Sequence, residues 1–167
     1  MNLKKETLLK KLRYKRTQWD STIDKIIKKG LENEIITKKW ILKDIISHIT
    51  WYEKELIKAI EDKTIAESEF WNMSYDERNE LIYNETKEKT LEEILKESAT
   101  INKILLEKIE KLSDEELNSD VFIKRKTNTR VTHNFIGGIT FWHYEDHEDV
   151  LIDRFDLEFG FSTNNTN

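Results

Sequence analysis

Two histidines, His143 and His147, stand four residues apart in a C-terminal segment with helical periodicity. On an α-helix this spacing places both imidazoles on one face, with their Cβ atoms about 5–6 Å apart. The same face continues through the apolar residues Ile136 and Ile139, so the pair lies on a stripe that is expected to face a core. Neutral imidazoles on a buried stripe need hydrogen-bond partners, or a shared metal ion that each ring binds through one nitrogen.

The metal hypothesis needs a third ligand, because a helical histidine pair alone is more often a pair of satisfied core or surface side chains. A third histidine, His48, lies on the core-facing stripe of another helical segment, together with Ile41, Ile45 and Tyr52. The fourth, His133, precedes the last helix and lies outside this pattern, so we expect it not to bind a metal.

The composition limits the classes of function. The chain has no cysteine, so any metal must be held by nitrogen and oxygen atoms. The net charge of −5, from 28 basic and 33 acidic residues, gives no electrostatic footprint for nucleic acid or for an anionic membrane. No apolar run approaches membrane-spanning length and no apolar signal core follows the first methionine, so we expect a cytoplasmic protein.

The elements that must position the histidines are predicted to be helices. The absence of proline, the presence of only four glycines and the helical periodicity favour an all-α chain. Four long helices are predicted, at about 3–29, 38–61, 90–112 and from 135 or 138 to 159. Capping boxes at Ser74, Thr90 and Ser113 predict three helix starts.

The remaining segments are predicted to connect these helices. Residues 62–73 are expected to form a loop, and 118–134 lose the helical period and include two candidate extended pieces, 121–123 and 130–132. Four amphipathic helices imply a single four-helix bundle domain over residues 1–160, with a frayed polar tail over 161–167. Bundles of this kind build metal and ligand sites in their cores from inward-facing side chains.

Two motifs carry a resemblance to a known superfamily. The stretch Trp40-Ile-Leu-Lys-Asp44-Ile-Ile-Ser-His48-Ile-Thr-Trp-Tyr52 resembles the second-helix signature of DinB-like proteins, which has a Trp, then Lys-Asp, then a histidine one turn later and an aromatic residue. The stretch from Thr140 through His147 resembles their last-helix motif, with two histidines four residues apart.

Within this superfamily the closest similarity is to the ClbS/DfsB group. Its members typically carry a Thr-aromatic-x-His-Tyr-Glu-x-His run, similar to the run that begins at Thr140. The pairs Trp71-Asn72, Arg78-Asn79 and Ile82-Tyr83, followed by residues 112–117, also resemble the middle section of that group. The resemblance covers residues 4–155, with one departure at Ile41, where relatives often have Ser or Thr as the helix cap.

The resemblance implies a DinB-like four-helix bundle in which His48, His143 and His147 bind a divalent metal ion, zinc or nickel. Three nitrogen ligands leave coordination positions open for water or substrate, which is typical of catalytic rather than structural sites. Two flanking side chains are candidate catalytic residues. Asp44, one turn before His48, could accept an N–H or stabilise the helix N-terminus. Tyr52, one turn after it, could donate a proton, orient a substrate or simply pack.

Several side chains near the histidines are expected to lie outside the site. Tyr144, Glu145 and Glu148 point away from the histidine face of a regular helix, so we expect them at its flank or surface. Arg154 continues the histidine stripe and is expected to close the cavity or to pair with an acid.

Two functions follow from the resemblance. One is an enzyme acting on a small electrophilic molecule, as a hydrolase or a thiol-dependent transferase; the ClbS-like branch is associated with hydrolytic opening of a cyclopropane warhead in a genotoxic metabolite, which implies detoxification or self-resistance. The alternative is a non-catalytic bundle that binds a small molecule or a metal. The sequence does not choose between these. Homodimerisation is common among such bundles and is kept as an expectation, although no stretch of the sequence indicates an interface.

Overall fold

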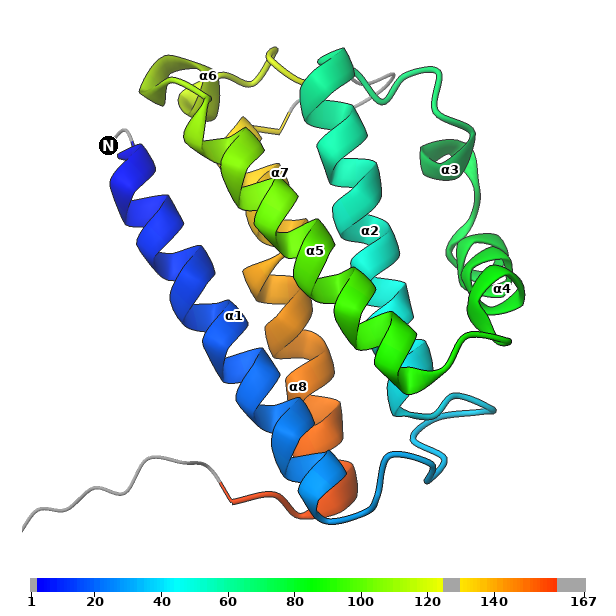
Figure 1. The fold of residues 1–167 in the computed structure, drawn as a ribbon. Helices are drawn as coiled ribbons and strands as arrows, with labels where there is room; N and C mark the ends of the chain where they lie inside the picture. The colour runs from blue at the N-terminus through cyan, green and yellow to red at the C-terminus, as the bar shows by residue number, and fades with distance from the viewer. Residues whose placement is uncertain (1–2, 125–129, 159–167) are drawn as a thin grey trace, which may run out of the picture.

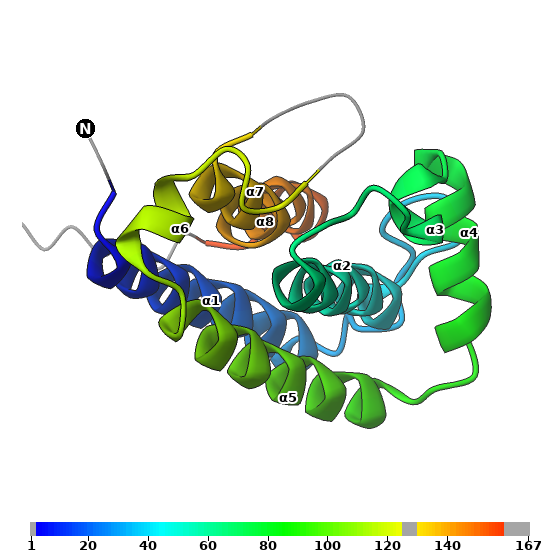
Figure 2. The same ribbon diagram turned by 90° about the horizontal axis from the view of Figure 1, so that it is seen from above.

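The computed structural model describes residues 3–124 and 130–158, and over these residues the chain is helical without a β-strand. Its long helices pack side by side as a bundle, and two short helices, α3 and α4, lie outside it, along α2 (Figures 1 and 2). The prediction of an all-α helical bundle is therefore confirmed. The helices are α1 (Lys5–Lys28), α2 (Leu42–Asp62), α3 (Glu69–Asn72), α4 (Tyr75–Thr86), α5 (Leu91–Glu110), α6 (Asp114–Asn118), α7 (Thr132–Ile139) and α8 (Phe141–Phe155).

All three predicted capping boxes start a helix. At the start of α4, the Ser74 hydroxyl accepts from the Glu77 amide at 3.3 Å, and the Glu77 carboxylate accepts from the Ser74 amide at 2.7 Å. Thr90 and Ser113 make the same reciprocal pair of bonds at α5 and α6. Each box satisfies two amides that have no partner within the helix, so these boundaries are encoded locally.

The second helix begins later than its periodicity predicts, at Leu42 rather than near Lys38. Lys38 has a positive φ of 50°, and a tight turn brings the Trp40 amide to the Thr37 carbonyl at 2.8 Å. A residue in the left-handed region ends any regular helix, so residues 37–40 form a turn instead. This turn places the Trp40 ring 5.4 Å from the His48 ring.

The predicted single last helix is interrupted at Thr140, whose φ of −116° and ψ of −101° are not helical. The interruption separates α7 from α8 and directly precedes the histidine pair. Gly137 allows it, because a Cβ at this position would lie 2.6 Å from Cζ of Phe141 and 2.9 Å from the Trp142 ring. The Phe141 ring thus occupies the space that the side chain of any residue other than glycine would need at position 137.

Two further boundary predictions were wrong. The predicted loop at 62–73 contains the short helix α3, and the candidate extended pieces at 121–123 and 130–132 form no strand, since Thr132 already belongs to α7. An isolated bridge joins Thr64 and Lys124 instead. The last helix was predicted to run to about residue 159 but ends at Phe155, because Asp156 adopts a left-handed φ of 46°. The predicted tail at 161–167 lies outside the described residues.

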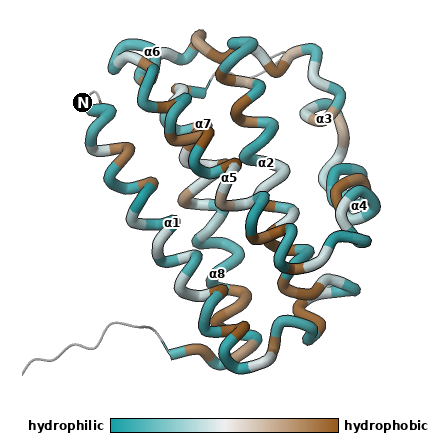
Figure 3. Tube along the Cα trace, viewed as in Figure 1, coloured by the Kyte–Doolittle hydropathy of each residue, from teal (hydrophilic) through white to brown (hydrophobic). Residues whose placement is uncertain are grey.

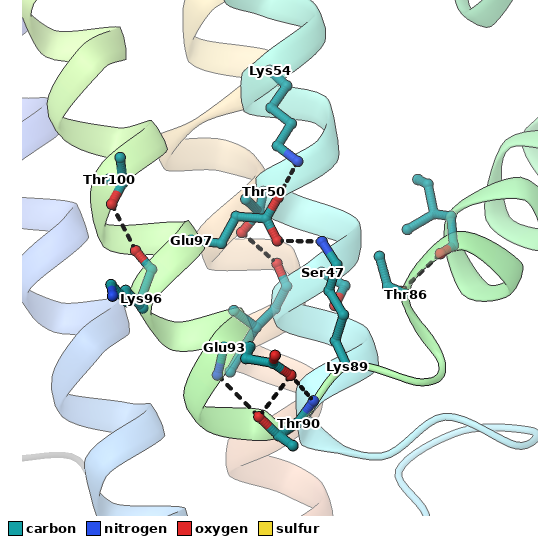
Figure 4. Close-up of polar contacts among 12 residues, drawn as sticks. Ser47, Thr50, Lys54, Thr86, Lys89, Thr90, Glu93, Lys96, Glu97 and Thr100 are labelled. Atoms are coloured by element: carbon teal, nitrogen blue, oxygen red, sulfur yellow. Dashed lines mark hydrogen bonds and ion pairs between the residues drawn. The ribbon is translucent and has the colours of Figure 1, made fainter.

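The helices α2 and α5 are held together by polar contacts at the edge of their interface as well as by apolar packing. Figure 4 shows the Glu97 carboxylate of α5 accepting from Lys54 of α2 and from Lys89, which precedes α5; the latter distance is 2.7 Å. In the same view, the Thr90–Glu93 box starts α5. Hydrophilic and hydrophobic residues alternate around the long helices (Figure 3), and within the described part none is apolar enough over a sufficient length to cross a membrane.

The buried apolar residues form two clusters at opposite ends of the bundle, and charged and polar side chains lie between them. One cluster gathers at the α6–α7 end and the other at the end where α1 meets the C-terminal part of α8. Between the two clusters, α1, α2, α5 and α8 each contribute a buried or half-buried polar residue. On α2 and α8, the histidines lie within a few residues of this polar layer. The layer consists of Arg16, Glu53, Asn102 and Tyr144.

Candidate metal centre

The three histidines predicted from the sequence come together in space. His48 lies on α2, and His143 and His147 lie on successive turns of α8. Nε2 of His143 is 2.9 Å from Nε2 of His48 and 3.1 Å from Nε2 of His147. One nitrogen from each ring therefore points at a common centre, and these atoms all lie within 4.8 Å of one another.

These separations fit a shared metal ion. Two nitrogens that each bind an ion at about 2.1 Å are about 3.0 Å apart at a right angle and about 3.4 Å apart at the tetrahedral angle. Both distances are closest to the right-angle value, so Nε2 of His143 is near enough to each of the other two nitrogens to share an ion with it. Where all three Nε2 atoms present lone pairs, their mutual repulsion favours a cation at the centre. The donor set therefore fits a divalent ion with nitrogen ligands.

Burial keeps these rings neutral. Desolvation, and then the neighbouring His143 and His147, lower the pKa of His48 to about 2. Desolvation and His147 lower the pKa of His143 to about 3. The pKa of His147 is also lowered by burial, although Asp146 opposes the shift. At neutral pH all three rings carry a free lone pair, which is the protonation state that binds a metal.

The histidines line one wall of a cleft of about 860 Å³. The cleft runs between α8 and α4, with His48 and Ile45 of α2 also lining it and the turn at 37–40 lining one end. Trp40, Tyr75 and Val150 supply apolar and aromatic lining, and Tyr75 is 70% exposed. This volume suits a small organic molecule whose reactive group reaches the three nitrogens.

Tyr52 lies against the histidines but outside the residues that line the cleft. Its ring centroid is 4.9 Å from that of His48 and 5.1 Å from that of His143. Its hydroxyl is 3.5 Å from Nη1 of Arg78, and burial raises its pKa while this guanidinium lowers it. The ring of Phe70 packs edge-on against the Tyr52 ring, with the ring centroids 5.1 Å apart. Tyr52 therefore supports the ligand rings from behind.

Asp44 is buried at the start of α2. One carboxylate oxygen accepts from the Ile41 amide at 3.0 Å, which supplies one half of a capping box. In the other half, the Asp44 amide donates to the backbone carbonyl of Ile41 at 3.1 Å, since isoleucine has no side-chain acceptor. Of the two roles considered for Asp44, the contacts of its carboxylate match stabilisation of the helix N-terminus, one turn before His48.

The expectation that Tyr144 lies at the flank or surface was wrong. It is 1% exposed, stacks on Trp19 with ring centroids 5.9 Å apart, and donates a hydrogen bond to the Glu53 carboxylate. Asn102 of α5 donates to the same carboxylate at 3.3 Å, and Arg16 of α1 lies 3.7 Å from it. Because α8 is buried on its α1 side as well as on its histidine side, a residue pointing away from the histidines still faces the core.

The remaining predicted positions agree better with the structure. Glu145 pairs with Lys15 at 2.9 Å, and Glu148 accepts from the hydroxyl of Thr22, so both lie at the α1-facing flank. His133 lies outside the cluster and bonds the Leu117 carbonyl at 2.9 Å through Nδ1. The prediction for Arg154 was wrong: within the described residues it neither lines the cleft nor pairs with an acid, and it donates to the Ile35 carbonyl at 3.1 Å.

Sequence reasoning missed the α4 wall of the site. Asn79 and Asp76 line the cleft opposite the histidines, and the side chain of Asn79 raises the pKa of His48 against the effect of burial. The only signal for this wall was the Arg78-Asn79 pair within the resemblance. Polar residues on a short helix of weak amphipathicity look like a solvated face until the neighbouring helices are placed.

Comparison with protein families agrees with this geometry. The model of the DinB family matches residues 1–148, which include the whole histidine cluster. The chain belongs to the DinB family. No curated protein sequence and no solved structure matches this chain, so its membership of the ClbS/DfsB group stays a prediction. DinB proteins commonly bind metals, and the three histidines of this member form a group that could hold one.

Proposed function

We propose that this DinB protein binds one divalent metal ion, zinc or nickel, through His48, His143 and His147, and uses it to process a small electrophilic molecule in the cleft. The observation that carries the proposal is the convergence of three neutral imidazole nitrogens, 2.9 and 3.1 Å apart, on one wall of that cleft. A divalent ion held there supplies Lewis acidity and lowers the pKa of a water or thiol nucleophile.

The side chains of the chain have separate tasks in this proposal. The histidines stay neutral and hold Nε2 toward the centre, because burial disfavours their protonated forms. Trp40 and Tyr75 exclude water from the apolar part of a substrate along the cleft. A substrate that fills this space would hold its reactive carbon close to the nucleophile. Such positioning lowers the entropic cost of bringing the two reacting groups together.

Tyr52 and Asp44 are proposed to contribute to this chemistry. Tyr52 would transfer a proton or orient the substrate through its hydroxyl, to which Arg78 donates at 3.5 Å. Asp44 would act through the start of α2 and hence through the position of His48. A Tyr52→Phe variant separates the first role from packing, since it removes only the hydroxyl. An unchanged kcat in this variant would remove Tyr52 from the catalytic group.

The proposal is tested by assaying metal-loaded protein against a panel of epoxides, activated cyclopropanes and Michael acceptors, with and without a thiol. Turnover that requires the metal and disappears in His143→Ala supports an enzyme, and dependence on the thiol separates a transferase from a hydrolase. Stoichiometric metal without turnover across the panel would favour the non-catalytic binding protein. Resemblance to the ClbS/DfsB group places hydrolysis of a strained ring first in the panel, in a detoxification or self-resistance role.

A further inference from the structure

The rings of two proposed ligands each have a second nitrogen that needs a partner. Nδ1 of His48 and Nδ1 of His143 are both buried, and neither makes a hydrogen bond of ordinary geometry within the described residues. If Nε2 binds a metal, Nδ1 must carry the proton, and a buried N–H without an acceptor costs free energy. Each ring therefore calls for an oxygen acceptor on its far side.

For His143 the backbone supplies this acceptor. Hydrogen bonding from the Ile139 backbone raises the pKa of His143, and only an oxygen that accepts a proton from the ring has this effect. The Ile139 carbonyl is available because the helix is interrupted at Thr140. The backbone bonds across the interruption run from the Thr140 amide to the Ile136 carbonyl and from the Tyr144 amide to the Thr140 carbonyl. Within the described part of the chain, no backbone amide donates to the Ile139 carbonyl across this interruption.

For His48 the helix α2 is regular, so no backbone carbonyl is released in the same way. The acceptor that acts on this ring is Asn79 of α4, whose side-chain hydrogen bonding raises the pKa of His48. Oδ1 of Asn79 is itself buried and lacks a hydrogen bond of ordinary geometry, as Nδ1 of His48 does. A buried acceptor on α4 and a buried donor on α2 thus belong to residues that line the same cleft, between two helices that pack on one another.

Asn79 is carried by a firmly anchored helix. The neighbouring Arg78 donates to the carbonyls of Phe70, Trp71 and Met73 at 2.9, 3.0 and 2.8 Å, so the first turn of α4 is tied to α3. The Ser74 capping box fixes where α4 begins. α4 in turn packs on α2, which carries His48. The position of Asn79 relative to His48 is therefore set by three helices.

We infer that Asn79 is a positioning residue that accepts the Nδ1–H of His48, fixes the tautomer of this ring and so aims Nε2 at the metal. The inference rests on the proposed metal-binding function and deepens it, because α4 would then raise the affinity for the metal through Asn79 in addition to lining the cleft. An amide acceptor, unlike a carboxylate, orients the ring without adding a negative charge to the site.

The test compares Asn79→Leu, Asn79→Asp and a control, Asn84→Leu, which makes the same change on an exposed face of the same helix. Each protein is titrated with Zn²⁺ against a chromophoric chelator, and the tautomer of His48 is read by NMR of nitrogen-labelled histidine. We expect Asn79→Leu to weaken zinc binding by about 10- to 100-fold and Asn79→Asp to preserve it, as for outer partners of other metal-bound histidines. The control should bind zinc as the wild type does.

Two results would overturn the inference. One is zinc binding by Asn79→Leu that equals that of Asn84→Leu; the other is a wild-type His48 that carries its proton on Nε2. Should Asn79→Leu fail to fold by circular dichroism, Asn79→Ser makes the same comparison with a smaller side chain. A wild type that binds no zinc would contradict the proposed function, and the tautomer of His48 in wild type and variant would still decide this inference.

Discussion

The hydroxyl of Tyr144 donates a hydrogen bond to the carboxylate of Glu53, joining α8 to α2 at the centre of the bundle. Both side chains are buried, at 1% and 0% exposure. Tyr144 directly follows His143, and Glu53 lies five residues after His48, so this bond and the histidine cluster connect the same two helices through different faces. Burial raises the pKa of Glu53, while Arg16, Tyr144 and Asn102 lower it.

Removing this hydroxyl should destabilise the fold. In Tyr144→Phe, the Glu53 carboxylate and the Asn102 amide each lose a buried partner. We expect the free energy of unfolding to fall by about 1–3 kcal/mol, measured by urea denaturation. The control is Tyr14→Phe on the exposed face of α1, which should change it by less than about 0.5 kcal/mol. Equal values for the two variants would show that the buried hydroxyl contributes nothing to stability.

The neutral histidines should make stability depend on pH. The folded-state pKa values of His48 (about 2) and His143 (about 3) lie below the unfolded value of 6.5, so the unfolded chain binds more protons in the window between them. The free energy of unfolding in the presence of a chelator should therefore fall as the pH decreases below 6.5, approaching about 1.4 kcal/mol per pH unit for each histidine.

A double variant, His48→Gln with His143→Gln, isolates this effect. Glu53, whose raised pKa works in the opposite direction, and the surface carboxylates titrate in both proteins. We expect a shallower slope between about pH 6.5 and 4.5 in the double variant. Parallel stability curves for the two proteins would contradict burial of these rings in the neutral form.

The interruption before α8 should depend on Gly137 but not on its neighbour. In Gly137→Ala the new Cβ meets Cζ of Phe141 at 2.6 Å, and the displaced ring should lower the free energy of unfolding by about 1–3 kcal/mol. In Gly138→Ala the nearest atom is 3.7 Å away, and the gain in helix propensity is about 1 kcal/mol. Thermal denaturation of the pair should show opposite signs; two stabilised variants would contradict the close packing at Gly137.

Local signals predicted much of the fold. The capping boxes at Ser74, Thr90 and Ser113 fixed three helix starts, because their hydrogen bonds lie within four residues of the chain. The interruption at Thr140 was not predictable in this way. It depends on how the Phe141 ring packs against Gly137, which periodicity does not encode. The turn that delays α2 depends similarly on the backbone conformation of Lys38.

The histidine cluster was predictable because its members lie on helical stripes and in the motifs of the family resemblance. The residues around it were not. Tyr144 points away from the histidines and yet faces the core, since α1 covers that side of α8. Asn79 lines the same cleft as His48 only once α4 is placed against α2. Such contacts are decided by the arrangement of helices, and spacing along one helix does not reveal them.

The most direct test of the metal centre is elemental analysis of untagged protein after loading with Zn²⁺ or Ni²⁺ and gel filtration. The account predicts about one ion per chain for the wild type, as expected for a three-ligand site. It predicts loss of that ion in His143→Ala, whose ring lies between the other two, and its retention in a control, His133→Ala, outside the cluster. A folded wild-type protein without a bound ion after loading with either metal would contradict it.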